Sequence, residues 1–356
     1  MRLSTKRLIA VVILAVVLVS LLLQVPNVHS AELTAPEKAL AFLSNVLLLD
    51  LTKYNVKLER TVNYPSDFLG GQKDKEITYR LESAVNSLEV ACDFRNNTLI
   101  FLGLYGLRGS SFYAKMPPTD MLDAAKGLMQ RYQAYSGASY LQVMREMLES
   151  VTVMKPMTKV SGNVKLCISS NEPYTYFDWT YTVNGIDVER KQLRFAFYNG
   201  SFEYFGNSWD LYTVGSADLK VSREGAIRIA REHMQNYSWG VGDIIVRDFT
   251  ILDSPVSAEL SMQPREGNML YPWWNIRLYL DKVYPGMIGS IQVGLWADTG
   301  EITNIVPIST GGSIIQESPP ASIDELSSLN VYLIAMTIAI IAVTAGVALA
   351  LKKRRK

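Results

Sequence analysis

Stretches with a helical spacing of apolar residues recur three times along the chain, and each is followed by stretches in which apolar and polar residues alternate. A spacing of three and four places apolar side chains on one face of a helix, whereas alternation places them on one face of a strand. The order of these patterns predicts three units, each a helix followed by antiparallel strands. We therefore predict an α+β fold of tandem helix-plus-antiparallel-sheet modules.

The first unit is predicted over residues 31–108. It opens on Thr34-Ala35-Pro36-Glu37, a capping box with a proline early in the first turn, and its helix is expected to continue to Leu51. The glycine-rich stretch 103–109 lacks the spacing of a nucleotide-binding loop and is interpreted as a linker to the next unit. Strands are predicted over 77–84, 88–94 and 98–104.

The second unit, residues 109–215, repeats this order. One helix is expected to start at Pro117-Pro118-Thr119-Asp120, and Ser139 is a candidate cap for another. Residues 174–183 alternate strictly and are followed by Asn184-Gly185, a residue pair that a type I′ hairpin turn favours. Further strands are predicted over 193–197 and 201–205.

Residues 216–308 form the third predicted unit and show the clearest pattern. Ser222 is expected to cap a helix that places Ala226, Ala230 and Met234 on its inward face. Strands are predicted over 244–252, 273–280, 291–297 and 302–306, with an insert at 253–268.

Two segments of this third unit resemble the PepSY family: S-R-E-G-A-I-R-I-A-R-E-H at 222–233 and V-G-L-W-A-D-T-G-E-I at 293–302. The resemblance covers about residues 220–307 and depends mostly on Ala226, Ala230 and the turn Asp298-Thr299-Gly300-Glu301. It implies a cystatin-like fold, in which one helix packs on a curved antiparallel sheet. It also implies a role in inhibiting or regulating peptidases, as in membrane-anchored envelope proteins. The first two units resemble the PepSY family only in the order of their predicted helices and strands.

The C-terminal stretch 331–351 contains no charged residue and is followed directly by the five cations of 352–356. A helix of this length spans roughly 31 Å, which matches the hydrocarbon core of a bilayer. Because cationic segments stay on the cytoplasmic side, the tail is predicted to be cytoplasmic and the preceding chain to lie outside. Residues 309–330, rich in serine, proline and glycine, are predicted to form a stalk.

Residues 1–30 combine a basic start, an apolar core and small residues near Ser30, which is typical of a cleaved secretory signal peptide. The alternative is an uncleaved N-terminal membrane anchor. Both interpretations place residues 31–330 on the extracytoplasmic side of the membrane. With cleavage, the protein is expected to be a single-pass protein of the cell membrane with an extracytoplasmic ectodomain.

The net charge predicted for the ectodomain indicates which classes of partner are disfavoured. Of the 35 Lys and Arg, three precede the apolar core of residues 1–30 and five follow 331–351, which leaves 27 against all 34 Asp and Glu. The resulting net charge of about −7 argues against nucleic acid or anionic lipid as a partner.

Two cysteines and three sequons are relevant to an exported protein. Outside the cytoplasm, Cys92 and Cys167 could form a disulfide; the alternative is a buried thiol at Cys92 and a surface thiol at Cys167. The sequons at Asn96, Asn199 and Asn236 would suit a glycoprotein.

The sequence shows no catalytic constellation. Once residues 1–30 are removed, His233 is the only histidine, which excludes a zinc site built on several histidines. His233 lies beside Ala230 and Met234 on the predicted helix and is interpreted as a helix-face residue, not as the base of a catalytic triad. No catalytic, cofactor or metal site is predicted, and the protein is expected not to be an enzyme.

Trp273 and Trp274 are candidate ligand-contact aromatics, and one of them should be buried because adjacent strand residues point to opposite faces. The predicted function is non-catalytic: binding and inhibiting or regulating a peptidase or another envelope protein. The first alternative is an envelope module that binds a peptide, glycan or small ligand. The second alternative is an uncharacterised enzyme.

Overall fold

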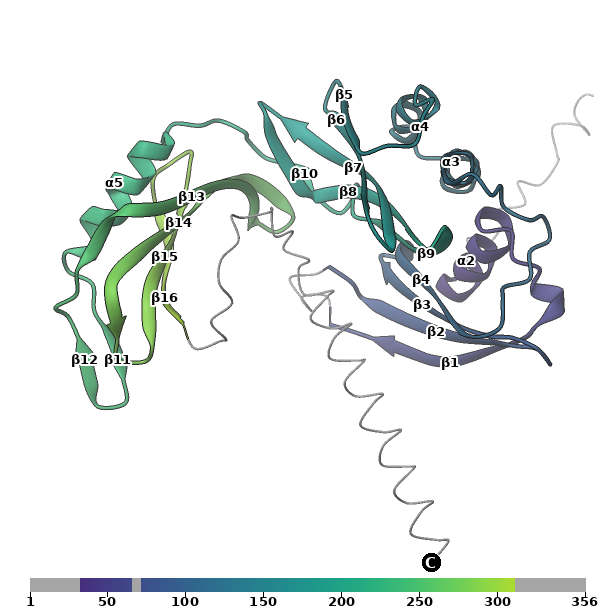
Figure 1. Ribbon diagram of the computed structural model, residues 1–356, viewed down its shortest axis with the longest axis horizontal. Coiled ribbons are helices and arrows are strands. Elements are labelled where there is room, and N and C mark those ends of the chain that lie inside the picture. Colours follow the sequence, from purple (N-terminus) through teal and green to yellow (C-terminus); the bar gives the residue numbers. More distant parts are fainter. Residues whose placement is uncertain (1–32, 66–71, 311–356) are drawn as a thin grey trace, which may run out of the picture.

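The computed structural model describes residues 33–65 and 72–310, which form two lobes (Figure 1). We call residues 33–212 the large lobe and residues 213–310 the small lobe. The fold is mixed α+β with mostly antiparallel sheets, as the sequence predicts. Within the described ranges, no helix is long and apolar enough to cross a membrane. The predicted signal peptide, stalk from residue 311 onward, membrane span and basic tail lie outside those ranges.

A single nine-stranded antiparallel sheet forms the large lobe, in the order β1-β2-β3-β4-β9-β8-β7-β6-β5. Strand β4 pairs with β9, so the first two predicted units are halves of one continuous sheet. The boundary predicted between residues 108 and 109 therefore falls inside one folded body. Its strands are β1 (Asn55–Asn63), β2 (Lys75–Glu82), β3 (Ser87–Arg95), β4 (Thr98–Arg108), β5 (Met157–Ser161), β6 (Val164–Asn171), β7 (Tyr174–Val183), β8 (Ile186–Tyr198) and β9 (Ser201–Asn207).

The helices of the large lobe all cover one face of this sheet (Figure 1). Phe42 is fully buried, and its ring lies 4.9 Å from that of Phe205 and 6.0 Å from that of Tyr132, which come from the second half. One hydrophobic core thus serves both halves. The helices are α2 (Ala35–Ala41), which continues as a π-helix (Phe42–Val46), α3 (Met121–Ser136), α4 (Leu141–Glu149) and a 3₁₀ turn (Leu51–Lys53).

Three predictions for the large lobe were wrong in detail. The first helix does not reach Leu51, because Leu48 adopts a left-handed φ of 61° that ends it. Strand β4 runs to Arg108, so most of the stretch interpreted as a linker is strand. Strand β1 was missed, because at the edge of the sheet its residues are mostly exposed and show no clear alternation.

In the small lobe, α5 (Arg223–Met234) packs on one face of a five-stranded sheet. Ser222 caps the helix by accepting a hydrogen bond from the Gly225 amide at 3.1 Å, and the predicted inward residues Ala226, Ala230 and Met234 are buried. The sheet contains β10 (Thr213–Val214), β13 (Ile251–Glu266), β14 (Met269–Tyr284), β15 (Ile288–Trp296) and β16 (Ile302–Ser309).

The strand predicted over 244–252 is divided in the structure. Its first part forms a separate two-stranded hairpin of β11 (Trp239–Val241) and β12 (Ile244–Val246). Its last residues begin β13, so the predicted insert at 253–268 is mostly a strand that pairs with β14. The sequence does not show the alternation typical of a strand over β13, because few residues of β13 are buried.

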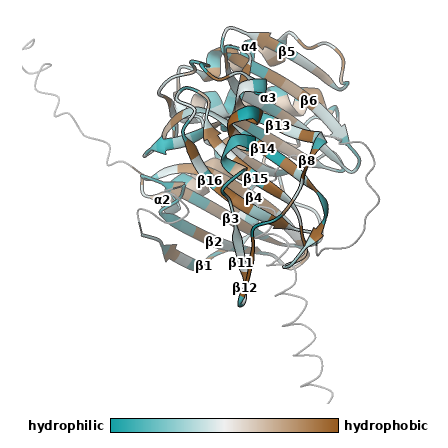
Figure 2. Cartoon of the chain, turned by 90° about the vertical axis from the view of Figure 1, so that its left-hand side faces the viewer, coloured by the Kyte–Doolittle hydropathy of each residue, from teal (hydrophilic) through white to brown (hydrophobic). Residues whose placement is uncertain are grey.

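The two lobes meet where Ile186 and Val188 of β8 pack with Met262 and Leu270 of the small lobe. Figure 1 shows α5 on the outer side of the small lobe and α2, α3 and α4 on the outer side of the large lobe. The helix-free faces of both sheets consequently face the space between the lobes. Hydrophobic and hydrophilic residues alternate along the strands, as side chains on opposite faces require (Figure 2).

Candidate functional site

Aromatic side chains gather on the helix-free face of the nine-stranded sheet. Because Phe177 and Trp179 point into the core, their neighbours Tyr174 and Tyr176 point to the opposite face. The rings of Tyr174 and Tyr176 stack at 5.7 Å, and that of Tyr198 lies 5.1 Å from Tyr174. We call the following set the tyrosine surface: Phe101, Tyr105, Tyr174, Tyr176, Tyr198 and Tyr204.

An ion pair fixes the centre of the tyrosine surface. Arg194 donates two hydrogen bonds to Asp178, from Nε at 2.5 Å and from a terminal nitrogen at 3.0 Å. The guanidinium also lies over the ring of Tyr176, at 5.2 Å from its centroid. Burial alone would lower the pKa of Arg194, but Asp178 reverses this and raises it. The pair therefore stays charged and holds Tyr176 in place.

Glu203 is a carboxylate beside this surface whose Oε2 is buried without a hydrogen-bond partner. Burial raises the pKa of Glu203, and the nearby Tyr174 hydroxyl offsets only part of that rise. The negative charge of Glu203 also acts on Tyr105, whose pKa burial and this charge raise to about 12. The tyrosine surface thus contains an acid that would be stabilised by a proton or by a cationic group of a partner.

Replacing Glu203 by glutamine should stabilise the protein at neutral pH. Because the folded-state pKa of Glu203 is raised, its carboxylate destabilises the fold above that pKa, and stability recovers as the pH falls through it. The advantage of Glu203→Gln over the parent should therefore shrink between about pH 7 and about pH 4. Denaturant unfolding at several pH values measures it.

Glu76→Gln is the control with the opposite sign. Although burial acts to raise the pKa of Glu76, its contact with Lys73 at 2.9 Å lowers it overall. This variant should lose stability near neutral pH, and the loss should shrink on acidification. If Glu203→Gln behaved in the same way as Glu76→Gln, Glu203 would have a cationic partner in solution, and the raised pKa of Glu203 would be contradicted.

The two predicted ligand-contact tryptophans lie on opposite faces of β14. Trp274 is 8% exposed and donates its indole N–H to the Val221 carbonyl at 2.9 Å. Trp273 is partly exposed on the helix-free face and donates to Thr303 Oγ1 at 2.9 Å. A Cβ at Gly294 would lie only 2.3 Å from Trp273, so the indole rests directly on that glycine. Of the two, only Trp273 is placed to touch a ligand.

The turn Asp298-Thr299-Gly300-Glu301 is tied to the β13–β14 hairpin through Arg265. The guanidinium lies 3.8 Å from the centroid of Tyr271 and 4.6 Å from that of Trp296, and it reaches Asp298 at 2.5 Å. Arg265 Nε and Asp298 Oδ1 are buried without further partners. Asp298 therefore has a structural role in this lobe, joining two turns of the sheet.

Arg265→Ala should lower the free energy of unfolding of the small lobe by about 2–3 kcal/mol, because it leaves the Asp298 carboxylate buried and unpaired. Arg277→Ala is the matched control: Arg277 also lies over a tyrosine, at 5.2 Å, but bonds Ser290 and no carboxylate. Its effect should be about 1 kcal/mol or less. Equal effects of the two variants in denaturant unfolding would contradict the role given to Asp298.

Both cysteines are free thiols. Cys92 is buried in β3 and Cys167 is partly exposed in β6, and these strands are separated in the sheet by β4, β9, β8 and β7. At about 4.8 Å per strand, the separation is several times the reach of a disulfide. The disulfide left open by the sequence is therefore not formed in this fold, and burial raises the pKa of the Cys92 thiol.

The three sequon asparagines are exposed. Asn96 lies in the turn between β3 and β4, Asn199 lies in the turn between β8 and β9, and Asn236 follows α5. A glycan on any of them would project into solvent.

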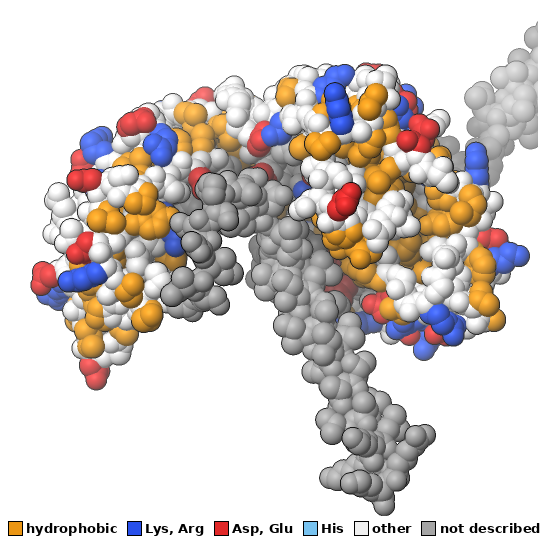
Figure 3. All heavy atoms as spheres, viewed as in Figure 1, with side chains coloured by type: hydrophobic (Ala, Val, Ile, Leu, Met, Phe, Trp, Pro, Cys, Tyr) orange, Lys and Arg blue, Asp and Glu red, His pale blue; other side chains and the backbone are white. Residues whose placement is uncertain are grey.

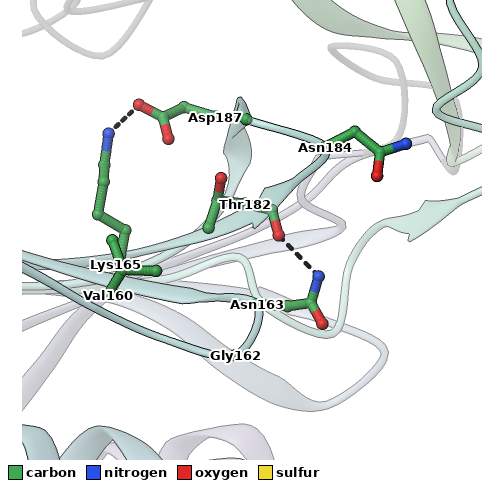
Figure 4. A pocket seen from close by; sticks show the side chains of 8 residues that line it. Val160, Gly162, Asn163, Lys165, Thr182, Asn184 and Asp187 are labelled. Atoms are coloured by element: carbon green, nitrogen blue, oxygen red, sulfur yellow. Dashed lines mark hydrogen bonds and ion pairs between the residues drawn. The ribbon is translucent and has the colours of Figure 1, made fainter.

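An open hollow of about 450 Å³ lies between the β5–β6 and β7–β8 turns (Figure 4). Its charged groups, Lys165 and Asp187, form an ion pair with each other. Asn163 donates to the Thr182 carbonyl at 2.9 Å, and Asn184 bonds the Ala217 carbonyl. Because these polar groups already have partners, the hollow is a weaker candidate than the tyrosine surface.

Groups suited to catalysis or metal binding do not converge in the described residues. His233 is exposed on α5, with Nδ1 3.2 Å from the Ile229 carbonyl one turn earlier. No three His, Cys, Asp or Glu side chains in the described part of the chain are arranged to hold a metal ion.

Comparison with known proteins gives little further information. No protein-family model and no curated protein matches this sequence. Among solved structures, the YpeB C-terminal domain of Bacillus megaterium is similar, with 10% identity and a TM-score of 0.31, over 78% of this chain and 99% of that chain. A TM-score this low does not establish a common fold, and no function follows from it.

Proposed function

We propose that this chain is a non-catalytic binding protein, anchored in a membrane with its folded part outside, which restrains or regulates a peptidase or another envelope protein. The tyrosine surface is the observation that carries the proposal. Tyrosine and arginine are enriched among the residues that dominate the energetics of protein interfaces. Tyrosine buries a large area while only two side-chain torsions are frozen. Here they are already held by stacking and by the Arg194–Asp178 pair.

Two features of the sequence support the proposed membrane location and the proposed kind of partner. The uncharged stretch 331–351 with its basic tail supports a C-terminal anchor. The resemblance of residues 220–307 to the PepSY family supports regulation of a peptidase. The buried Oε2 of Glu203, which has no hydrogen-bond partner, favours a partner that brings a basic side chain to the tyrosine surface.

The full-length chain in lipid nanodiscs, incubated with extracytoplasmic peptidases of its own envelope, tests the proposal. One of them should bind and lose activity, and Tyr176→Ala combined with Tyr198→Ala should weaken binding at least about 30-fold, as loss of two interface anchors does. Tyr279→Ala, which removes a tyrosine from the helix-free face of the small lobe, is the control and should bind normally. Turnover of a substrate by the chain itself would contradict a purely binding role.

Trp273 supports a second candidate function, the binding of a peptide, glycan or small ligand. Its indole is fixed by Thr303 and presents one face on the helix-free side of the small lobe. Flat aromatic surfaces of this kind stack on apolar faces of ligands. Glycan or peptide binding that is lost in Trp273→Ala and retained in Tyr176→Ala would favour this function over the first.

A further inference from the structure

Exposed apolar side chains form a tip at one end of the small lobe. Ile244 and Ile245 of β12 are 56% and 61% exposed, because a two-stranded hairpin buries neither face near its turn. Val283 and Met287, around the β14–β15 turn, are 52% and 57% exposed. We call these four residues the apolar tip. Hydrophobic atoms are visible at the lower left end of the small lobe, where β11 and β12 lie (Figures 1 and 3).

The two segments of the apolar tip are joined and rigidly supported. Trp239 donates its indole N–H to the Pro285 carbonyl at 3.2 Å, which links the hairpin to the β14–β15 turn. A Cβ at Gly286 would lie 2.8 Å from Val241, so only glycine allows this close approach. Behind the tip, the Trp239 ring lies 5.0 Å from Phe249 and 6.1 Å from Tyr284. The exposed side chains thus project from a packed base.

The polypeptide leaves the described structure beside this tip. Thr310, the last described residue, bonds the Met287 carbonyl through its amide at 2.7 Å and through its hydroxyl at 2.9 Å. Twenty residues, 311–330, then separate it from the predicted span at 331–351. A chain of twenty residues reaches about 70 Å when fully extended, and a random coil of that length has a root-mean-square end-to-end distance of roughly 25 Å.

We propose that the apolar tip docks on the outer surface of the same bilayer that holds the chain's own span. The tether keeps the local concentration of lipid surface high, so four apolar side chains suffice for docking that would be weak in a free protein. The ionic residues within three positions of the tip residues in the sequence are Asp243, Arg247, Asp248, Asp281 and Lys282, which sum to about one negative charge. Docking is therefore apolar and does not require anionic lipid.

This inference rests on the proposed membrane anchor and is independent of the proposed partner. Docking would give the small lobe two attachments to the membrane, the tip and the stalk. Two attachments restrict its rotation, so the helix-free faces would be presented in a fixed orientation to a partner on the same membrane.

Fluorescence quenching of the full-length chain in phosphatidylcholine vesicles tests the docking. An environment-sensitive fluorophore is attached through Ile245→Cys in a Cys167→Ser background, and the control carries it through Val85→Cys, a site that is 65% exposed in the large lobe. Relative to quenching by aqueous iodide, quenching by spin-labelled lipid should be at least about threefold stronger at 245 than at 85. Adding Ile244→Ser should remove most of that difference.

Each other outcome overturns the inference in a distinguishable way. Equal quenching by iodide at both sites would place the tip in water. Protection from iodide without quenching by spin-labelled lipid would place it against protein, such as a second copy of the chain. A chain that fails to float with the vesicles would contradict the anchor itself, whereas a chain that floats with its tip in water would contradict only the docking.

Discussion

Phe42→Ala is expected to lower the free energy of unfolding of the large lobe by about 3–5 kcal/mol, the range for truncating a fully buried aromatic side chain. Phe42 is 0% exposed, and its ring contacts Tyr135 at 5.5 Å as well as Tyr132 and Phe205. These partners belong to α3 and β9, in the second half of the sheet. The large lobe should therefore unfold in one cooperative step in both the parent and the variant.

Denaturant unfolding followed by tryptophan fluorescence measures this effect, because Trp179 and Trp209 report on the second half of the lobe. Leu58→Ala is the control, since Leu58 is 46% exposed and its truncation should change stability by no more than about 0.5 kcal/mol. If Phe42→Ala left the Trp179 transition unchanged, the two halves would be separate domains.

The second large effect is expected from Asp178→Ala, which should destabilise the large lobe by about 3 kcal/mol. The Arg194 and Asp178 side chains are only 19% and 13% exposed, so removing the carboxylate leaves a guanidinium largely shielded from water. Arg194→Met combined with Asp178→Ala removes both charges and should recover part of the loss.

A double-mutant cycle separates this coupling from simple truncation. The summed effects of Asp178→Ala and Arg194→Met should exceed the effect of the double variant by at least about 1 kcal/mol. Additive effects would mean that the pair contributes no net attraction. Because Arg194 lies over Tyr176, both single variants should also weaken partner binding at the tyrosine surface.

Local signals in the sequence predicted those elements whose ends are fixed by short-range chemistry. The Ser222 cap and the positions of Ala226 and Ala230 predicted α5, and alternation predicted β7. Strands β1 and β13 were missed, since strands with few buried residues lack the period that distinguishes a strand. The sequence also gave no reason to expect a single sheet, because the pairing of β4 with β9 joins residues about one hundred positions apart.

The same limit applies to the candidate site. Tyr174 and Tyr176 could be assigned to a surface from their parity, and Trp273 could be separated from Trp274 in the same way. Glu203 could not be found, because the tyrosines around it come from different strands and only the register of the sheet brings them together. Arg265 was missed for a similar reason, because its partner Asp298 is 33 residues away in the sequence.

Site-specific photocrosslinking in intact cells tests most directly whether the tyrosine surface binds a partner outside the membrane. A photoreactive side chain replaces Tyr198, which is 44% exposed, or Leu58, which is 46% exposed on β1, five strands away. The expected result is one discrete adduct with an extracytoplasmic protein from position 198, lost in Tyr176→Ala, and none from position 58. No adduct from position 198, equal adducts from both, or an adduct with a cytoplasmic protein would contradict the proposed function.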